Sequence, residues 1–251
     1  MRGESTVLVK TSVVVDVSSV VPMPGRHQIR GWVCAPRELR PTDQPRVVLC
    51  CLAGGRCTTS YFDLDVEGQG NYSMAEHLAA QGFVVVAIDH LGVGESSAVD
   101  DLFLVTPDVA SSANHHAFGE LLARLRAGSL TNELSAVPSS VAVGVGHSMG
   151  GMLTLVQQAH HHTYDAVANL GHGGDGLPQL LTRDELNVVG DSQALRAKIV
   201  DLARARFTPG PGRKAGARFP TPSTPQTCQR PCERRSSANN PPCCTRVGSP
   251  R

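Results

Sequence analysis

The feature that most constrains this chain is segment 141–151, in which a short apolar run leads into Gly-His-Ser-Met-Gly at residues 146–150. A Gly-x-Ser-x-Gly motif after a strand is typical of a nucleophile elbow, a sharp strand-to-helix turn that exposes the serine. Side chains on either side of the serine would collide with such a turn, so glycine is favoured there. The pattern predicts Ser148 as a nucleophile, with Gly146 and Gly150 as the elbow glycines.

The helix expected after the serine runs from Met149 to about His160, and its N-terminus points at Ser148. The backbone N–H of Met149 could then donate to an oxyanion formed during attack by the serine. A second interpretation stays open, because the spaced glycines after a strand also resemble a dinucleotide-binding loop. That loop would be expected after the first strand of its domain, with an acidic residue about 20 positions later, whereas this one comes late.

Length and charge favour one α/β domain that acts on a small molecule. The chain has 251 residues and a net charge of +1, which gives no electrostatic case for binding nucleic acid or an anionic membrane. We find no apolar stretch near the roughly 20 residues of a membrane span, and no signal-peptide pattern. We therefore expect a cytoplasmic protein with a small-molecule substrate, no nucleic-acid partner, no membrane span and no cofactor. The oligomeric state stays open.

The eight cysteines divide into two groups of four. The early group is expected to be buried thiols without disulfides, because Cys50 and Cys51 lie in a strand-like run whose adjacent side chains face opposite sides of a sheet. The late group matches no familiar zinc spacing, so we expect no metal site. The early group is Cys34, Cys50, Cys51 and Cys57, and the late group is Cys228, Cys232, Cys243 and Cys244.

Strand and helix patterns alternate along most of the chain. The expected strands are 7–15 and 27–35, which form an antiparallel hairpin, then 46–52, 83–88, the run from 141 and 164–170. The expected helices are one that begins at the capping box of Ser73 and closes at Gly82, and one from Thr106 to Gly128. Another capping box at 182–185 and a helix after Asp191 follow without an intervening strand.

The order of these parts resembles the α/β-hydrolase family over about 6–207. The elbow has the form found in many lipases, esterases and serine aminopeptidase-like members, and Asp-His-Leu-Gly-Val-Gly-Glu-Ser at 89–96 is similar to the turn after the family's fourth strand. The resemblance implies a mostly parallel sheet with helices on both faces, and a serine hydrolase of carboxylic esters or similar acyl compounds. It also implies an oxyanion loop at Ala-Gly-Gly 53–55, with the N–H groups of Gly55 and Met149 as donors.

The family's catalytic acid and histidine usually follow a seventh and an eighth strand, and neither strand is evident here. We therefore expect a domain at 1–207 that is incomplete at its C-terminal edge, with cap-like helices at about 177–207. The Pro- and Arg-rich segment 208–251 is expected to be a disordered tail, either authentic or out of frame.

Loss of the late histidine would impair activity. A substitute catalytic set of Ser148, His172 and Asp175 is one interpretation, because His172 would follow the strand next to the elbow strand. The other interpretation, which the sequence favours, is that His172 is an ordinary loop residue. The alternative function is then a non-catalytic relative that binds a ligand or partner in the same pocket.

Overall fold

The structure is a computed structural model, and it describes residues 6–39, 43–68, 70, 72–173, 191 and 198. Within these residues one sheet has the strand order β1-β2-β4-β3-β5-β6. The strands are β1 (Leu8–Asp16), β2 (Gln28–Pro36), β3 (Arg46–Leu52), β4 (Val84–Ile88), β5 (Ser140–His147) and β6 (Ala166–Leu170). The helices are α1 (Met74–Ala80), α2 (Pro107–Ala127) and α3 (Met149–His161), with short 3₁₀ turns η1 (Thr59–Phe62) and η2 (Leu102–Leu104).

The sheet is mixed but mostly parallel. The expected hairpin is present, since β1 pairs antiparallel with β2, and β2 then pairs antiparallel with β4. The remaining strands β4, β3, β5 and β6 are parallel. Parallel strands need crossover connections, and α1 and α2 provide two of them. The carboxyl ends of these four strands therefore meet at one edge, where the segment after β5 also begins.

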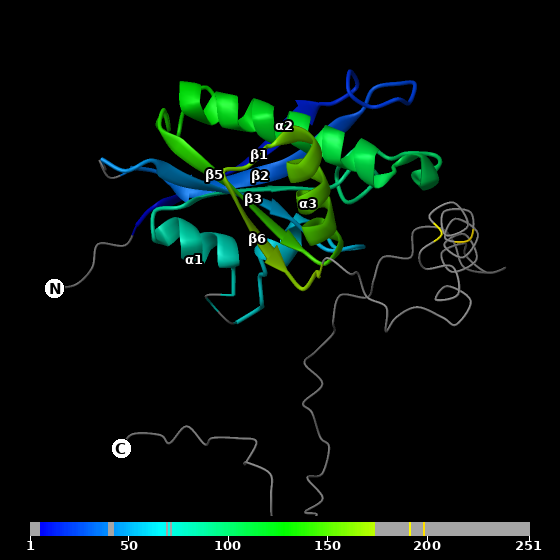
Figure 1. Ribbon diagram of the computed structural model, residues 1–251. Helices are drawn as coiled ribbons and strands as arrows, with labels where there is room; N and C mark the ends of the chain where they lie inside the picture. Colours follow the sequence, from blue (N-terminus) through cyan, green and yellow to red (C-terminus); the bar gives the residue numbers. More distant parts are fainter. Residues whose placement is uncertain are drawn as a thin grey trace, which may run out of the picture. The chain divides into compact units, whose positions relative to one another are not determined.

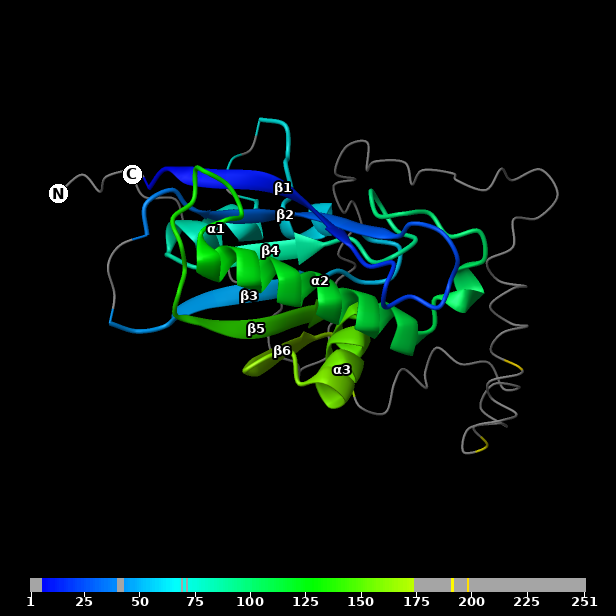
Figure 2. The ribbon, with the colours of Figure 1, turned by 90° about the horizontal axis from the view of Figure 1, so that it is seen from above.

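Helices cover both faces of the sheet, as the sequence predicts. Figure 1 shows α2 and α3 on one face and α1 on the other, and Figure 2 shows α2 lying along the strands. Adjacent residues of β3 divide between the two layers: Cys50 belongs to the core under α2 and α3, and Cys51 to the core under α1. Both are free, buried thiols, as expected, whereas Cys57 is free but only partly buried.

Helix ends lie where the sequence places their caps. The hydroxyl of Ser73 accepts the N–H of Glu76 at 3.0 Å, and that of Thr106 accepts the N–H of Val109 at 3.3 Å. Gly128 ends α2 in the left-handed region at φ 68°, which glycine adopts without steric cost. Local capping chemistry thus sets the lengths of the crossovers.

Several expectations concern segments outside the described residues. They are Asp175, the capping box at 182–185, the cap-like helices at about 177–207, the tail at 208–251 and the four late cysteines. In the part of the chain that is described, no helix combines the length and apolar character needed to cross a membrane.

Candidate active site

The turn between β5 and α3 is sharp and contains Ser148. Ser148 lies between the last residue of β5 and the first of α3, with φ 52° and ψ −116°. A non-glycine residue with these angles is strained, at a cost of about 1–3 kcal/mol, and persists only where the surroundings hold it. Ser148 is half-buried, so its side chain remains open to solvent or substrate.

The surroundings of the turn explain the two flanking glycines. A β-carbon on Gly146 would lie 2.5 Å from Thr154 Oγ1, and one on Gly150 would lie 2.5 Å from the carbonyl oxygen of Ala53. The carbonyl oxygen of Leu52 would be even closer to the latter. The first turn of α3 therefore packs directly on the end of β3. The absence of both side chains is what allows the sharp turn to fit.

The segment after β3 runs beside Ser148. A β-carbon on Gly54 would lie 3.4 Å from Ser148 Cβ, and one on Gly55 would lie 3.5 Å from Met149 Sδ. Met149 begins α3, so no earlier helical carbonyl can accept its N–H. Among the described residues we find no hydrogen bond from the N–H of Gly55 either. Two unused N–H groups thus belong to the segments that meet at Ser148.

The loop after β4 is a rigid frame beside this segment. The buried Asp89 carboxylate accepts the N–H groups of Thr59 at 2.7 Å and Glu95 at 3.0 Å. It thereby connects the start of η1 to the loop at 89–96. The sequence pattern of this loop was recognised, but the carboxylate's structural role as a double acceptor was not predicted.

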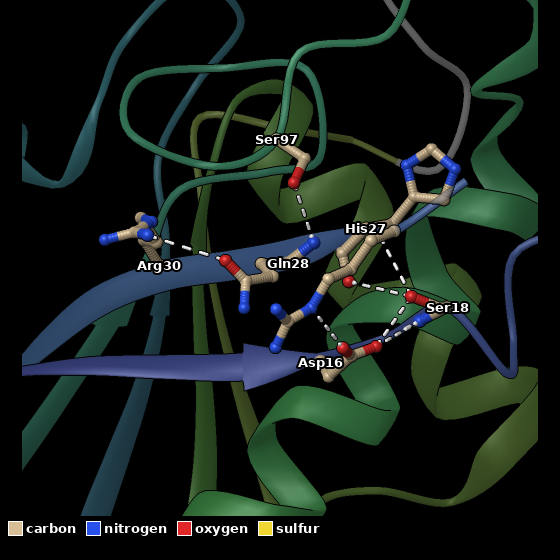
Figure 3. A network of polar contacts seen from close by, with 7 residues as sticks. Asp16, Ser18, His27, Gln28, Arg30 and Ser97 are labelled. Atoms are coloured by element: carbon tan, nitrogen blue, oxygen red, sulfur yellow. Dashed lines mark hydrogen bonds and ion pairs between the residues drawn. The ribbon is translucent and has the colours of Figure 1, made fainter.

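The same loop is attached to the edge of β2 by serine hydroxyls. Ser96 Oγ donates to the carbonyl of Asp89 at 2.7 Å and accepts the N–H of Arg30 at 3.0 Å. Ser97 Oγ accepts the N–H of Gln28 at 2.8 Å, as Figure 3 shows. The loop is therefore held from two sides, by η1 and by β2.

His147, which precedes the serine, lies against an aromatic ring. Its imidazole stacks on Tyr61 of η1, with ring centroids 4.8 Å apart and planes 9° apart. Its Nδ1 is buried and has no hydrogen-bond partner among the described residues. A ring held in this way packs against η1 at the turn. Nothing in the sequence around Tyr61 indicated its proximity to the elbow.

The sheet brings His172 to the same edge as Ser148. The N–H of Ser148 donates to the carbonyl of Leu170 at the end of β6, at 2.9 Å. Two residues later, His172 Cβ lies 3.2 Å from the place of a β-carbon on Gly151 in the first turn of α3. Within the described residues, however, no hydrogen bond joins His172 to Ser148. Asp175, the candidate acid, lies outside them.

Two further histidines lie at the end of α3 away from the turn. His160 and His161 occupy the last turn of α3, and the His161 ring stacks on His115 of α2 at 4.5 Å. Burial is the main cause that lowers the pKa of His115, followed by the neighbouring His161 and His116. Among the described residues, no three His, Cys, Asp or Glu side chains are arranged to hold a metal ion.

Comparison with known proteins gives a family and a fold. The sequence profile described as "Alpha/beta hydrolase family" matches residues 47–242. No curated protein sequence matches the chain.

Solved structures with a similar fold share little sequence with the chain. An alpha/beta hydrolase from Novosphingobium aromaticivorans is 16% identical, with 63% of this chain and 42% of that chain covered and a TM-score of 0.42. An epoxide hydrolase from Vigna radiata is 14% identical, with coverages of 62% and 36% and a TM-score of 0.40. A thioesterase domain from the curacin biosynthetic pathway is 22% identical, with coverages of 62% and 41% and a TM-score of 0.37. The chain spans less than half the length of each.

Proposed function

The chain belongs to the alpha/beta hydrolase family, and we propose that it is a serine hydrolase of carboxylic esters or similar acyl compounds with Ser148 as its nucleophile. The observation that carries this proposal is the strained backbone of Ser148, at φ 52° and ψ −116°. Backbone strain of this kind is typical of functional sites. Here it sets the position of the Ser148 hydroxyl in the strand-to-helix turn. A small-molecule substrate and a cytoplasmic location belong to the same proposal.

The proposed reaction proceeds through an acyl-enzyme. Ser148 Oγ attacks the substrate carbonyl carbon and gives its proton to a base, and the carbonyl oxygen becomes an oxyanion. The N–H groups of Gly55 and Met149 are the proposed donors to that oxyanion. As the intermediate collapses, the base returns its proton to the leaving oxygen, which departs as the alcohol. Water, deprotonated by the same base, then attacks the acyl-enzyme, and the acid leaves as Ser148 Oγ regains its proton. The position of both donors in segments beside Ser148 supports this assignment.

The proposed base is His172, with Asp175 as its acidic partner. Its support is the position of His172, which follows β6 and lies beside the first turn of α3. A neutral imidazole there could accept the serine proton after a small side-chain movement, since catalytic hydrogen bonds often form only in the substrate complex.

The test is labelling with a fluorophosphonate probe together with hydrolysis of p-nitrophenyl esters. We expect labelling that Ser148→Ala abolishes and that Ser60→Ala, a change at an exposed serine of η1, leaves intact. If no effective base is present, the expected activity is weak, because an elbow and an oxyanion hole alone retain roughly 10³–10⁴-fold catalysis over water. A probe that labels some other residue would refute the assignment of Ser148.

His172→Ala distinguishes a mechanism in which His172 is the base from one in which it has no catalytic role. If His172 is the base, this change should remove as much activity as Ser148→Ala, because members of one catalytic set are not additive. The matched control is His160→Ala at the exposed far end of α3, which should have no effect. Activity that survives His172→Ala unchanged would mean that His172 is not the base.

A second candidate function is a non-catalytic protein that binds a ligand or partner at this site. The observation that favours it is that imidazoles with a hydrogen bond among the described residues use other partners, such as Ala53 for His90 and Thr163 for His115. The same probe decides between the two: a folded chain that no fluorophosphonate labels at any pH from 6 to 9 would favour the binding protein.

A further inference from the structure

A buried histidine outside the proposed catalytic set contacts the segment that leads into the oxyanion loop. Because β3 and β4 are parallel, with Leu52 opposite Ile88, Ala53 and His90 leave the sheet at the same edge. His90 is 3% exposed, and its Nε2 lies 3.0 Å from the carbonyl oxygen of Ala53. The N-terminal half of α2 supplies the second partner, since Asn114 Nδ2 lies 3.3 Å from His90 Nδ1.

These two contacts fix the protonation of the ring. A carbonyl oxygen can only accept, so Nε2 must carry the hydrogen that it donates to Ala53. Nδ1 of a neutral imidazole is then free to accept from the amide of Asn114. Burial is the largest influence on His90 and lowers its pKa, against smaller opposing effects of the Ala53 hydrogen bond and the Asp89 carboxylate. The neutral Nε2–H form therefore gives both ring nitrogens a partner.

The carbonyl that His90 holds lies at the centre of the site. The oxygen of Ala53 also packs against Gly150, where a β-carbon would lie 2.5 Å away. The peptide bond is planar, so the orientation of this carbonyl also sets the direction of the Gly54 N–H. Gly54 and Gly55 follow, and glycine has the widest choice of backbone angles. A turn bond from the N–H of Cys57 to the Gly54 carbonyl, at 3.0 Å, holds the far end of this segment. The Ala53 contact with His90 is the one that ties its near end to the loop after β4.

We propose that His90 is a positioning residue for the oxyanion loop: its Nε2–H bond to the Ala53 carbonyl fixes the path of residues 54 and 55 past Ser148. Its effect on catalysis rests on the function proposed above, whereas its effect on the loop does not. The ring is too deeply buried to reach a substrate, so it acts through the backbone.

The test compares His90→Gln with His90→Asn in the full chain. The Gln amide nitrogen can reach the place of Nε2, whereas the Asn amide is one carbon shorter and reaches only the place of Nδ1. In NMR spectra the amide resonances of Gly54 and Gly55 should stay in place in His90→Gln and move in His90→Asn. The control His77→Leu, at an exposed histidine of α1, should move neither.

Kinetics supply a readout that a merely structural role would not change. His90→Asn should lower kcat on an ester by on the order of tenfold to a hundredfold with KM nearly unchanged, because misplaced donors fail mainly in the transition state. His90→Gln should keep most of the kcat of the unaltered chain. Equal kcat in the two variants, or glycine resonances that move in neither, would overturn the positioning role.

The outcomes distinguish this proposal from the proposed function. If the resonances of Gly54 and Gly55 respond as expected but no probe labels Ser148 in the unaltered chain, His90 positions the loop and the hydrolase proposal fails. Should His90→Asn not fold, the ¹⁵N spectrum of His90 in the unaltered chain decides. A hydrogen on Nδ1 instead of Nε2 would overturn the proposal without any variant.

Discussion

The contact between α3 and β3 predicts that Gly150→Ala strongly destabilises the fold. Gly150 is in the first turn of α3, where alanine would ordinarily be the better helix former. Its added β-carbon, however, would lie 2.5 Å from the carbonyl oxygen of Ala53 and closer still to that of Leu52. Neither oxygen can rotate away, because both belong to the backbone at the end of a central strand.

The magnitude follows from the displacement that this overlap requires. Ordinary contact begins at about 3.4 Å, so the helix and the strand must separate by at least about 0.9 Å. Overpacking of this kind costs about 1–3 kcal/mol. The matched control is Gly119→Ala in α2, where a β-carbon would meet nothing within 4 Å. At position 119 alanine should raise the free energy of unfolding by about 0.5–1 kcal/mol, because the only change is its higher helix propensity than that of glycine.

Urea denaturation followed by circular dichroism measures both variants. They should differ by about 2 kcal/mol or more, with the unaltered chain between them. For an m value of about 1–3 kcal/mol/M, the two midpoints should lie roughly 1 M apart. A Gly150→Ala variant as stable as Gly119→Ala would refute the close packing of α3 on β3, and with it the geometric account of the turn.

Three further changes test other parts of the structure. Ser148→Gly should raise the free energy of unfolding by up to about 1 kcal/mol in a thermal melt, because glycine tolerates φ 52°, whereas Ser148→Ala should not. Thr106→Ala should cost about 0.5–1 kcal/mol in urea, because Val109 loses its cap acceptor. Burial lowers the pKa of His90, so as pH falls below 6.5 the unfolded chain binds a proton that the folded chain excludes. Stability measured against pH should therefore fall there, less steeply in His90→Gln.

Much of the fold follows from signals that are local in the sequence. Caps at Ser73 and Thr106 begin two helices where predicted, and Gly128 ends the second. The strand expected at 164–170 is shorter and begins at Ala166. The reason is tertiary, because the Tyr164 ring covers Gly144 of β5, and its backbone N–H and C=O bond to the side chain of Gln158 instead of a neighbouring strand.

The partners of the site residues do not follow from local signals. Tyr61 stacks on His147 from 86 positions away in the sequence. The contact between His90 and Ala53 depends on the parallel register of β3 and β4, which no pattern within either strand encodes. Sequence reasoning therefore predicted a sharp turn at Ser148 between two glycines, but not the side chains that surround it. The register of neighbouring strands determines which side chains contact the site residues, and register is set only when the sheet assembles.

The strained serine also shows how the sheet and the site depend on each other. The backbone of Ser148 has no local reason to adopt φ 52°, so contacts from elsewhere must compensate for its strain. One is the packing of Gly150 on the end of β3, and another is the hydrogen bond from the Ser148 N–H to Leu170 at the end of β6. These contacts come from the strands on either side of β5. A one-residue slip of either neighbour would remove one of them, and the serine could then relax into an ordinary conformation. Correct pairing of β3, β5 and β6 is therefore a condition for the strained conformation of Ser148, and the described part of the sheet fulfils it.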